Sequence, residues 1–442
     1  MRIACIFLLT SRLIMAAGPL QLSLKRAVEV ATSPEGSARI QLSDEALKQA
    51  QARSLEQRAA LLPNVDAAFT DQNRTANLAA QGFNPSLFSS LPIPNFSFPT
   101  FVGPFTTVDA RVSGSQSVFD FSTIRRYQAS KVGISAARSD LNATQEQVAA
   151  QVARAYLTAV KGDADVETAL ANVTLSEAVL KQSENQKEAG TGTGIEITRA
   201  KVQLANDRQR LLVAQNARHS THLQLLRAMN LRLDTELELT DKLQYLPVDA
   251  VTLDAAKAQA LKERPDLKAQ QERESNARLS ASATKLERLP SVAAFGDYGP
   301  SGTALDKSVP TRAVGFQVRV PIFDGGRRDA RREESASQYR SETVRTNDLK
   351  EQIELDVRLA LDSLQSADQE VKVAQEGLEL ANNELTQARR RYDAGVAISL
   401  EVTDAQTRLE RARDNQTEAL YSYNLARLDL AQSMGRARSI LQ

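Results

Sequence analysis

Two carboxylates, Glu401 and Asp404, lie three residues apart shortly after the dipeptide Ala394-Gly395. This spacing places both side chains on one face of a helix. If several copies of the chain assemble around an axis, the pair would form two stacked acidic rings, which select cations and raise one another's pKa values. The alternative is a pair of ordinary carboxylates near the positive end of a helix. For Glu196, which follows an earlier turn of the same kind, we favour this second interpretation.

Other residues that could carry chemistry lack the partners that the chemistry needs. His219 and His222 could share a metal ion, but no third ligand lies nearby, so packing between helices is the better interpretation. The run from Gly190 to Gly194 resembles a phosphate-binding loop, yet it lacks a preceding strand and a Lys-Ser/Thr ending, and we interpret it as a turn. No nucleophile lies in a pattern with a base. The sequence therefore predicts no enzyme, no cofactor and no metal site.

The composition excludes several classes of function. A net charge of +1 over 442 residues gives no field that favours nucleic acid, and Cys5, the single cysteine, excludes a disulfide framework. Residues 1–17 combine an early positive charge with an apolar run, which predicts a cleaved signal peptide; Arg12 interrupts the run, and a mis-assigned start is the alternative. No later run approaches the ~20 apolar residues of a membrane-spanning helix, so any crossing of a membrane must use strands.

The chain contains an internal duplication. Residues 189–198 align with residues 394–403 at a shift of 205 positions, with the Ala-Gly pair, the glutamate and the threonine in register. A period this long indicates two copies of a half-molecule, which we place at 18–250 and 251–442.

Each half contains a long helical hairpin, which we predict at 122–230 and 327–435. From Val357 to Tyr392, seam residues follow in steps of three and four, alternately large and small, which predicts tight antiparallel pairing. The outgoing helix of each hairpin would be on the order of 100 Å long, whereas a compact chain of this length has a radius of gyration of about 22 Å. The molecule must therefore be elongated, with apolar flanks that require further copies of the chain.

Two stretches that alternate between apolar and polar residues precede each hairpin. They predict four strands, at 64–73, 108–120, 291–299 and 312–323. These lengths suit a tilted crossing of a bilayer, but four strands cannot close a barrel, and open edges are excluded in lipid. Two copies would supply eight strands and three copies twelve; a pore that continues into a helical tube favours three. The predicted fold class is mainly α with a small β part.

The connecting segments are predicted more coarsely. Residues 20–60 and 252–288 are each expected to be helical, and 231–250 to form an equatorial segment with a short strand around Leu237. The segment 82–105 is rich in phenylalanine and proline. It is either a flexible loop or an apolar flap outside the cell, and both interpretations stay open.

Several segments resemble a known family. The tip at 391–406, the junction Val320-Pro321-Ile322-Phe323-Asp324-Gly325-Gly326 and the Leu-Pro pairs that precede the strands are similar to those of the TolC-like outer-membrane efflux proteins. The resemblance covers nearly all of the chain after the predicted signal peptide. It implies a homotrimer in which a twelve-stranded outer-membrane barrel continues into an α-helical periplasmic tunnel. It further implies passive export of small molecules such as drugs or metals in a tripartite efflux pump or type I secretion system, with a periplasmic adaptor and an inner-membrane transporter of the RND or ABC type.

The resemblance also implies roles for individual residues. Glu401 and Asp404 match the acidic selectivity ring at the tunnel entrance. Tyr392 matches a tyrosine that holds the entrance closed, with Glu196 as its expected hydrogen-bond acceptor. The second tip would then be the gate and the first tip its frame. The adaptor is expected to dock on both tips, around Gly190, Thr191, Gly395 and Val396.

Two residues depart from the family pattern. Glu401 replaces the usual aspartate, and Ala397 stands where some members carry a basic residue that braces the closed state, so we expect a weaker latch. Two rival functions stay open from the sequence. One is protein secretion through the same architecture, and the other is a structural coiled-coil protein of the envelope without a pore.

Overall fold

The computed structural model describes residues 19–82, 100–248 and 251–438. These residues form two compact units, to which both repeats contribute. The tip unit comprises residues up to 46, 137–269 and 346 onward, and the sheet unit comprises 47–136 and 270–345. The predicted signal peptide, 1–17, and most of the Phe/Pro-rich segment, 83–99, lie outside the described residues.

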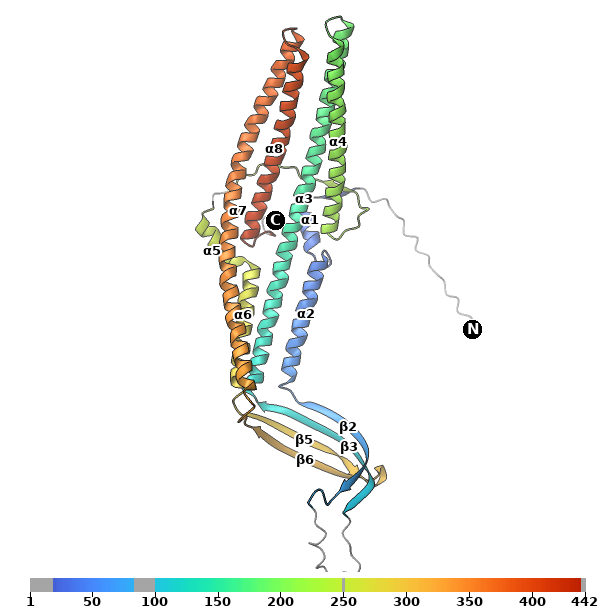
Figure 1. The fold of residues 1–442 in the computed structure, drawn as a ribbon, viewed down its shortest axis with the longest axis vertical. Helices are drawn as coiled ribbons and strands as arrows, with labels where there is room; N and C mark the ends of the chain where they lie inside the picture. The colour runs from blue at the N-terminus through green and yellow to red at the C-terminus, as the bar shows by residue number, and fades with distance from the viewer. Residues whose placement is uncertain (1–18, 83–99, 249–250, 439–442) are drawn as a thin grey trace, which may run out of the picture. The chain divides into compact units, whose positions relative to one another are not determined.

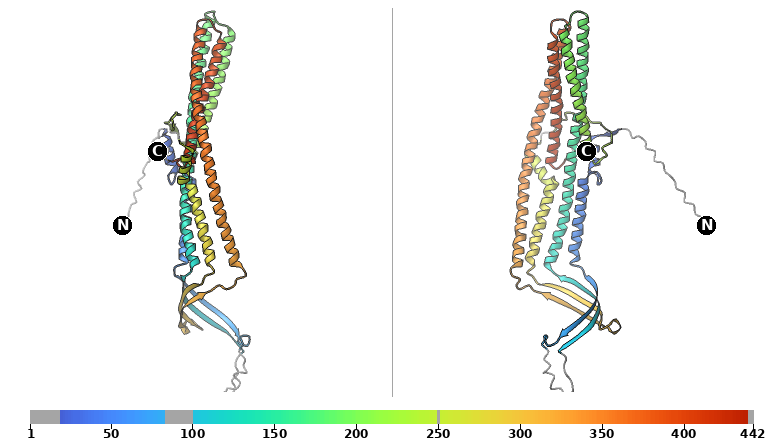
Figure 2. Two further views of the ribbon diagram at one scale, coloured as in Figure 1. Left: turned by 90° about the vertical axis from the view of Figure 1, so that its left-hand side faces the viewer. Right: turned by 45° about the vertical axis from the view of Figure 1, so that its right-hand side comes forward.

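The tip unit is built around two helical hairpins, which run side by side in both views of Figure 2. The first pairs α3 (Phe121–Glu188) with α4 (Gly194–Ala228), and the second pairs α7 (Arg327–Asp393) with α8 (Ser399–Ser433). The predicted hairpins are therefore present, and α3 and α7 each continue from the sheet unit into the tip unit. No helix in the described ranges contains a stretch that is both long and apolar enough to cross a membrane.

The predicted seam of α7 is confirmed. Along it, large and small side chains alternate in the buried core, as the heptad pattern requires for close approach of two helices. The buried seam residues of α7 are Val357, Ala360, Ala367, Val371, Ala381, Leu385, Ala388 and Tyr392. In the half near the tips they pack against Val179 of α3 and Val402, Ala405 and Leu409 of α8, so the two hairpins share one core.

The segments predicted as single helices, 20–60 and 252–288, are each interrupted. The first contains α1 (Leu24–Thr32) and α2 (Ala38–Ala59), and the second contains α5 (Leu253–Glu263) and α6 (Pro265–Leu286). Proline at the start of a helix is favourable, but inside a helix it removes a hydrogen bond, which explains the breaks near Pro34 and at Pro265. The predicted equatorial strand is β4 (Leu237–Leu239), which pairs in parallel with an unpredicted strand, β1 (Leu20–Leu22).

The sheet unit contains a four-stranded antiparallel sheet in the order β2-β3-β5-β6, shown in Figure 1. Its strands are β2 (Asn64–Asn77), β3 (Phe101–Phe119), β5 (Ser291–Gly302) and β6 (Val309–Arg319). A short 3-10 helix, Leu305–Lys307, connects β5 to β6. The starts of β2 and β5 agree with the prediction, but the other boundaries differ. The largest differences are that β3 begins at 101 instead of 108, and that β2 and β6 end at 77 and 319 instead of 73 and 323. Pro321 lacks the N–H that a ladder needs, which accounts for the earlier end of β6.

The two faces of the sheet differ in polarity. Pairing of Ala67 with Val112 and of Val112 with Tyr298 places these residues on one face. That face exposes Val65, Phe69, Val112, Tyr298, Val314, Phe316 and Val318. On the opposite face, Arg111 contacts the carboxylates of Asp109 and Asp297 and donates to the Thr311 hydroxyl at 3.0 Å.

Candidate functional site

The two hairpin tips have the same backbone geometry. Gly190 and Gly395 adopt positive φ angles of 74° and 71°. The N–H of the following residue donates to a carbonyl five residues back in both turns, from Thr191 to Gln186 and from Val396 to Arg391, each at 2.9 Å. This arrangement is a Schellman motif, in which a glycine in the left-handed region ends the helix. The duplication therefore preserves the turn itself.

Glu196 stabilises the start of its own helix. Its carboxylate accepts a hydrogen bond from the Thr193 N–H at 2.8 Å, at the N-terminus of α4. The pKa of Glu196 lies below its ordinary value, mainly because of this bond, with smaller contributions from hydrogen bonds to the Thr193 and Ser399 side chains. These contacts agree with the interpretation of Glu196 as an ordinary N-terminal helix carboxylate.

Glu401 is equivalent to Glu196 but makes a different contact. The N-cap position of α8 is Ile398, whose side chain has no hydroxyl, and Glu401 instead forms an ion pair with Arg391 at 3.2 Å. Asp404 is exposed and has no ion-pair partner among the described residues. Among the described residues, the second tip of each chain thus presents one carboxylate in an exposed ion pair and one without an ion-pair partner.

Tyr392 is buried in the core shared by the two hairpins. Its hydroxyl has no hydrogen-bond partner in the described part of the chain, so the expected bond to Glu196 is not made in this structure. Burial raises the pKa of Tyr392, and the nearby negative charge of Glu196 raises it further, while the neighbouring Ser183 side chain opposes the rise. Tyr392 thus connects the hairpins through packing of its ring.

The four predicted docking residues, Gly190, Thr191, Gly395 and Val396, are all exposed. Val396 is 72% exposed, and Ile195 and Ile398 are also exposed at the tips. Single exposed apolar residues are common, but several of them on two adjacent turns form a surface suited to contact with a protein.

A polar cluster lies between the hairpins, and the sequence patterns did not predict it. Asp207 of α4 and Glu410 of α8 have almost fully buried side chains. The amide of Gln203 donates to both carboxylates, at 3.1 Å and 3.2 Å. Arg210 lies 2.5 Å from the Glu410 carboxylate and 3.8 Å from that of Asp207, and the Ser176 hydroxyl donates to Asp207. We name these residues the inter-hairpin cluster.

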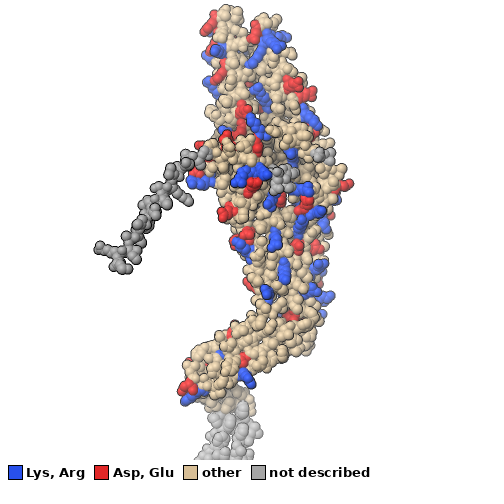
Figure 3. Space-filling model, turned by 180° about the vertical axis from the view of Figure 1, so that it is seen from behind, with Lys and Arg blue, Asp and Glu red and all other residues tan. Residues whose placement is uncertain are grey.

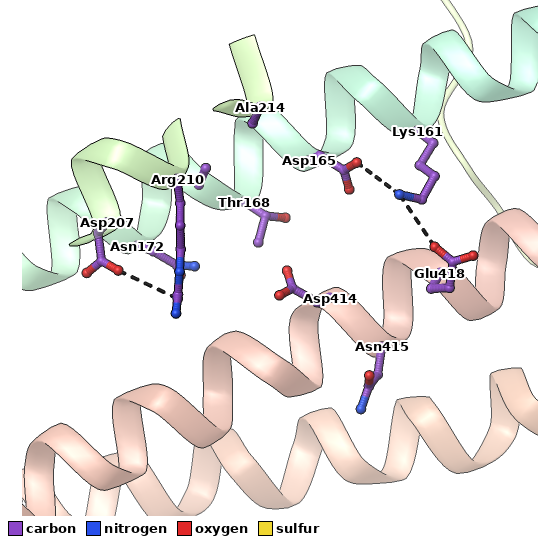
Figure 4. Close-up of a pocket in the computed structure, with 11 residues that line it drawn as sticks. Lys161, Asp165, Thr168, Asn172, Asp207, Arg210, Ala214, Asp414, Asn415 and Glu418 are labelled. Atoms are coloured by element: carbon purple, nitrogen blue, oxygen red, sulfur yellow. Dashed lines mark hydrogen bonds and ion pairs between the residues drawn. The ribbon is translucent and has the colours of Figure 1, made fainter. Parts of the chain in front are cut away.

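The cluster borders a pocket between α3, α4 and α8, shown in Figure 4. Lys161 bridges Asp165 of its own helix, at 3.0 Å, and Glu418 of α8, at 3.4 Å. Burial raises the pKa of Asp414, and the negative charge of Asp165 adds to the rise. The contact of α3 and α4 with α8 is therefore charged over several turns, and this charged region lies apart from the apolar core that the two hairpins share.

The pKa of Glu410 is raised in this environment. Burial is the largest cause, and the charge of Asp207 adds to it, while Arg210 and Gln203 oppose the rise. Two buried carboxylates with one arginine disfavour full ionisation. The inter-hairpin cluster consequently favours a bound proton at Glu410 more strongly than the unfolded chain does.

The histidines lie elsewhere in the tip unit. His222 contacts the Asp163 carboxylate at 3.0 Å, next to an ion pair between Asp163 and Arg218. Among the described residues, no group of three or more His, Cys, Asp or Glu is arranged to hold a metal ion.

Comparison with known proteins places these features in context. A family model described as "Outer membrane efflux protein" matches residues 35–231 and 257–436, once in each repeat. The pyoverdine export outer membrane protein OpmQ of Pseudomonas putida is 23% identical over 402 residues, covering 88% of this chain and 81% of the relative. The alkaline protease secretion protein AprF of Pseudomonas aeruginosa is 21% identical over 320 residues, covering 71% of this chain and 66% of the relative.

A solved structure supports the fold. The chain superimposes on the Campylobacter jejuni CmeC outer membrane channel with a TM-score of 0.79 at 16% identity, covering 94% of this chain and 86% of that one. Long helical hairpins joined to a small sheet are thus a known combination.

Proposed function

The chain belongs to the outer membrane efflux protein family, and we propose that three copies of it assemble into one exit duct. The protein is an outer-membrane channel of an efflux or secretion system, with its helical part in the periplasm. The observation that carries the trimer is a four-stranded sheet whose edge strands, β2 and β6, each lack a second partner strand among the described residues.

The sheet explains why assembly is required. One face exposes large apolar side chains, with Val314 83% and Phe316 76% exposed. A face of this kind suits lipid, where every backbone N–H and C=O must be paired. Pairing β6 of one copy with β2 of the next satisfies both edges, and three copies close a twelve-stranded barrel. The polar face with Arg111, Asp109 and Asp297 then lines the lumen.

The partners follow from the tips. We propose that a periplasmic adaptor docks on the exposed turns at Gly190, Thr191, Gly395 and Val396, and that the adaptor connects the duct to an inner-membrane transporter. The exposed apolar side chains of Val396 and Ile398 support this proposal, because a protein partner would bury them. The relatives give two classes of cargo: OpmQ is named for pyoverdine export and AprF for alkaline protease secretion. We favour small molecules, because OpmQ matches more of this chain.

Reconstitution of the purified protein in planar bilayers would test whether it forms a trimeric duct. Purified protein in planar bilayers should give discrete conductance steps, and it should migrate as a heat-sensitive trimer on gels. A protein that remains a monomer in detergent and gives no conductance would contradict the trimeric duct. A structural coiled-coil protein would give this second result.

We further propose that Glu401 and Asp404 form the selectivity rings of the entrance. A trimer would bring six carboxylates together, and such rings attract cations strongly. Replacing both residues with alanine should weaken block of the channel by a trivalent cation, applied from the tip side, by on the order of tenfold or more. A matched control replaces Glu184 and Glu188, two carboxylates near the end of α3. Equal loss of block in the control would argue against the rings.

We propose that Tyr392 holds the second hairpin against the first through its ring. Tyr392→Phe removes only a hydroxyl that has no partner within hydrogen-bonding geometry among the described residues. The free energy of unfolding should therefore change by less than about 1 kcal/mol, and the conductance should stay close to that of the wild type. Tyr392→Ala leaves a cavity in the shared core and should cost about 3–5 kcal/mol. A higher conductance of the phenylalanine variant would instead indicate that the hydroxyl bonds to another group, such as Glu196, in the closed trimer.

A further inference from the structure

The four junctions between strands and helices lie at one end of the sheet. Asn64 pairs with Ser115, Phe119 with Val292, and Ser291 with Arg319. These pairs bring the starts of β2 and β5 level with the ends of β3 and β6. The helices α2, α3, α6 and α7 therefore meet the sheet along one line, which we name the junction belt, residues 53–63, 119–131, 284–290 and 319–334.

The junction belt carries an excess of positive charge. The whole chain is balanced, with 55 Lys and Arg against 54 Asp and Glu, but the belt has twelve of the first kind against seven of the second. Figure 3 shows Lys and Arg side chains on the helices next to the sheet, while the sheet surface in this view is mostly uncharged. The excess is therefore local.

The carboxylates of the belt do not neutralise this charge. Glu287 pairs with both Arg126 and Arg331, Asp324 with Arg328, and Asp329 with Arg288. Among the described residues, several exposed cations of the belt have no carboxylate within ion-pair distance. They are Arg58, Arg125, Lys285, Arg319, Arg327 and Arg332.

Exposed apolar side chains lie in the same junctions. Ile322 is 94% exposed and Phe323 is 87% exposed, and Phe323 lies four residues before Arg327 in the chain. Leu62, Phe119 and Leu289 are exposed at the other three junctions. Large apolar groups next to free cations are typical of a surface in the headgroup region of a bilayer, where the apolar groups enter the acyl layer and the cations meet phosphate.

We propose that the junction belt binds the phosphate groups of anionic phospholipids in the periplasmic leaflet of the outer membrane. This inference rests on the proposed insertion of the sheet, because insertion brings the belt to the membrane surface. The excess charge identifies an anionic headgroup, and the exposed Ile322 and Phe323 identify a lipid over a free phosphate. Bound lipid would fix the depth of the barrel and surround the junction where strands become helices.

The test measures lipid preference of the full-length trimer in detergent by native mass spectrometry, with phosphatidylglycerol and phosphatidylcholine as probes. The wild type should retain phosphatidylglycerol selectively. Arg327→Gln with Arg332→Gln should reduce that preference about 25-fold, because each basic residue near an anionic surface contributes a factor of about five. The control, Arg199→Gln with Lys201→Gln, removes the same charge from exposed positions on α4 and should keep the preference.

Additional variants and a competition measurement distinguish failure of the belt proposal from failure of the proposed duct. Phe323→Ala should weaken phosphatidylglycerol retention, and inorganic phosphate should not displace the lipid; displacement by equimolar phosphate would overturn the assignment to lipid. Equal losses in the control and belt variants would overturn the belt. If the wild type inserts and conducts but shows no preference, the belt proposal fails alone. If the wild type neither inserts nor conducts, the proposed duct itself fails.

Discussion

Arginine in place of Phe316 should keep this protein out of the outer membrane. Phe316 is 76% exposed in the chain, on the apolar face of β6. If that face meets lipid, an arginine inside the bilayer costs up to about 2–4 kcal/mol per copy, depending on its depth, and a trimer incurs the cost three times. We therefore expect the heat-sensitive trimer to fall below about a tenth of its normal amount in outer-membrane fractions, measured by immunoblotting.

The neighbouring residue provides a matched control. Gln317 lies one position further along β6, so its side chain points to the opposite, polar face. Gln317→Arg introduces the same side chain at nearly the same depth, but into the proposed lumen. It should assemble at close to the wild-type amount. If both variants fail equally, the two faces have been assigned wrongly; if both assemble, the sheet does not face lipid.

The elements with regular periodicity could be predicted from the sequence. The seam from Val357 to Tyr392 is periodic over many turns, and its residues are buried as expected. The strands were also found, because alternation on a sheet with one apolar face is a strong signal. The ends of helices and strands were harder to predict. Strand β6 ends before Pro321, and the helix predicted at 252–288 is broken at Pro265. A single residue such as a proline determines where an element ends, whereas a periodic pattern is recognised from many residues together.

The candidate site could be predicted only in part, because contacts between distant residues decide it. Glu196 and Glu401 look equivalent in the duplicated sequence. Their N-cap residues differ, threonine at 193 and isoleucine at 398. Glu196 accepts a hydrogen bond from the Thr193 N–H, whereas Glu401 forms an ion pair with Arg391. The position of Tyr392 at the tip was foreseen, but its burial without a hydrogen-bond partner was not. Whether a side chain finds a partner depends on helices that lie far away in the sequence.

The inter-hairpin cluster was missed for a related reason. Charged residues on a helix usually face solvent, and Asp207 and Glu410 occur among many exposed charges. One signal was available for Asp207, which lies three residues after the buried Leu204 and therefore on the same face of α4. Glu410 directly follows Leu409 and does not share its helix face, so the sequence carried no comparable signal for it. Only the arrangement of α4 against α8 shows that both carboxylates meet at one arginine.

Removing that arginine should destabilise the tip unit in a way that depends on pH. Arg210→Ala leaves Asp207 and Glu410 buried without a cation. Breaking a fully buried pair costs about 3–5 kcal/mol. Because the Arg210 side chain is about half exposed, we expect about 2–3 kcal/mol at neutral pH, seen as a fall of a few degrees in the melting temperature of the detergent-solubilised protein.

The pH dependence follows from Glu410. Its pKa is raised in the native chain by burial and by Asp207, and Arg210 opposes that rise, so the variant should raise the pKa further. A native state that binds this proton more tightly than the unfolded state gains stability as the pH falls through the raised pKa. The deficit of the variant should therefore shrink between about pH 8 and about pH 5. Circular dichroism melts across that range measure it.

Two further variants identify the cause. Arg208 lies two residues before Arg210 and forms an exposed ion pair with Glu177 at 2.8 Å, so Arg208→Ala should cost less than about 1 kcal/mol at every pH. Adding Glu410→Gln to Arg210→Ala should restore most of the lost stability at neutral pH, because the amide needs no proton to remain neutral. If the double variant melts as low as Arg210→Ala alone, the loss comes from packing of the Arg210 stem, and the two carboxylates do not compete for one charge.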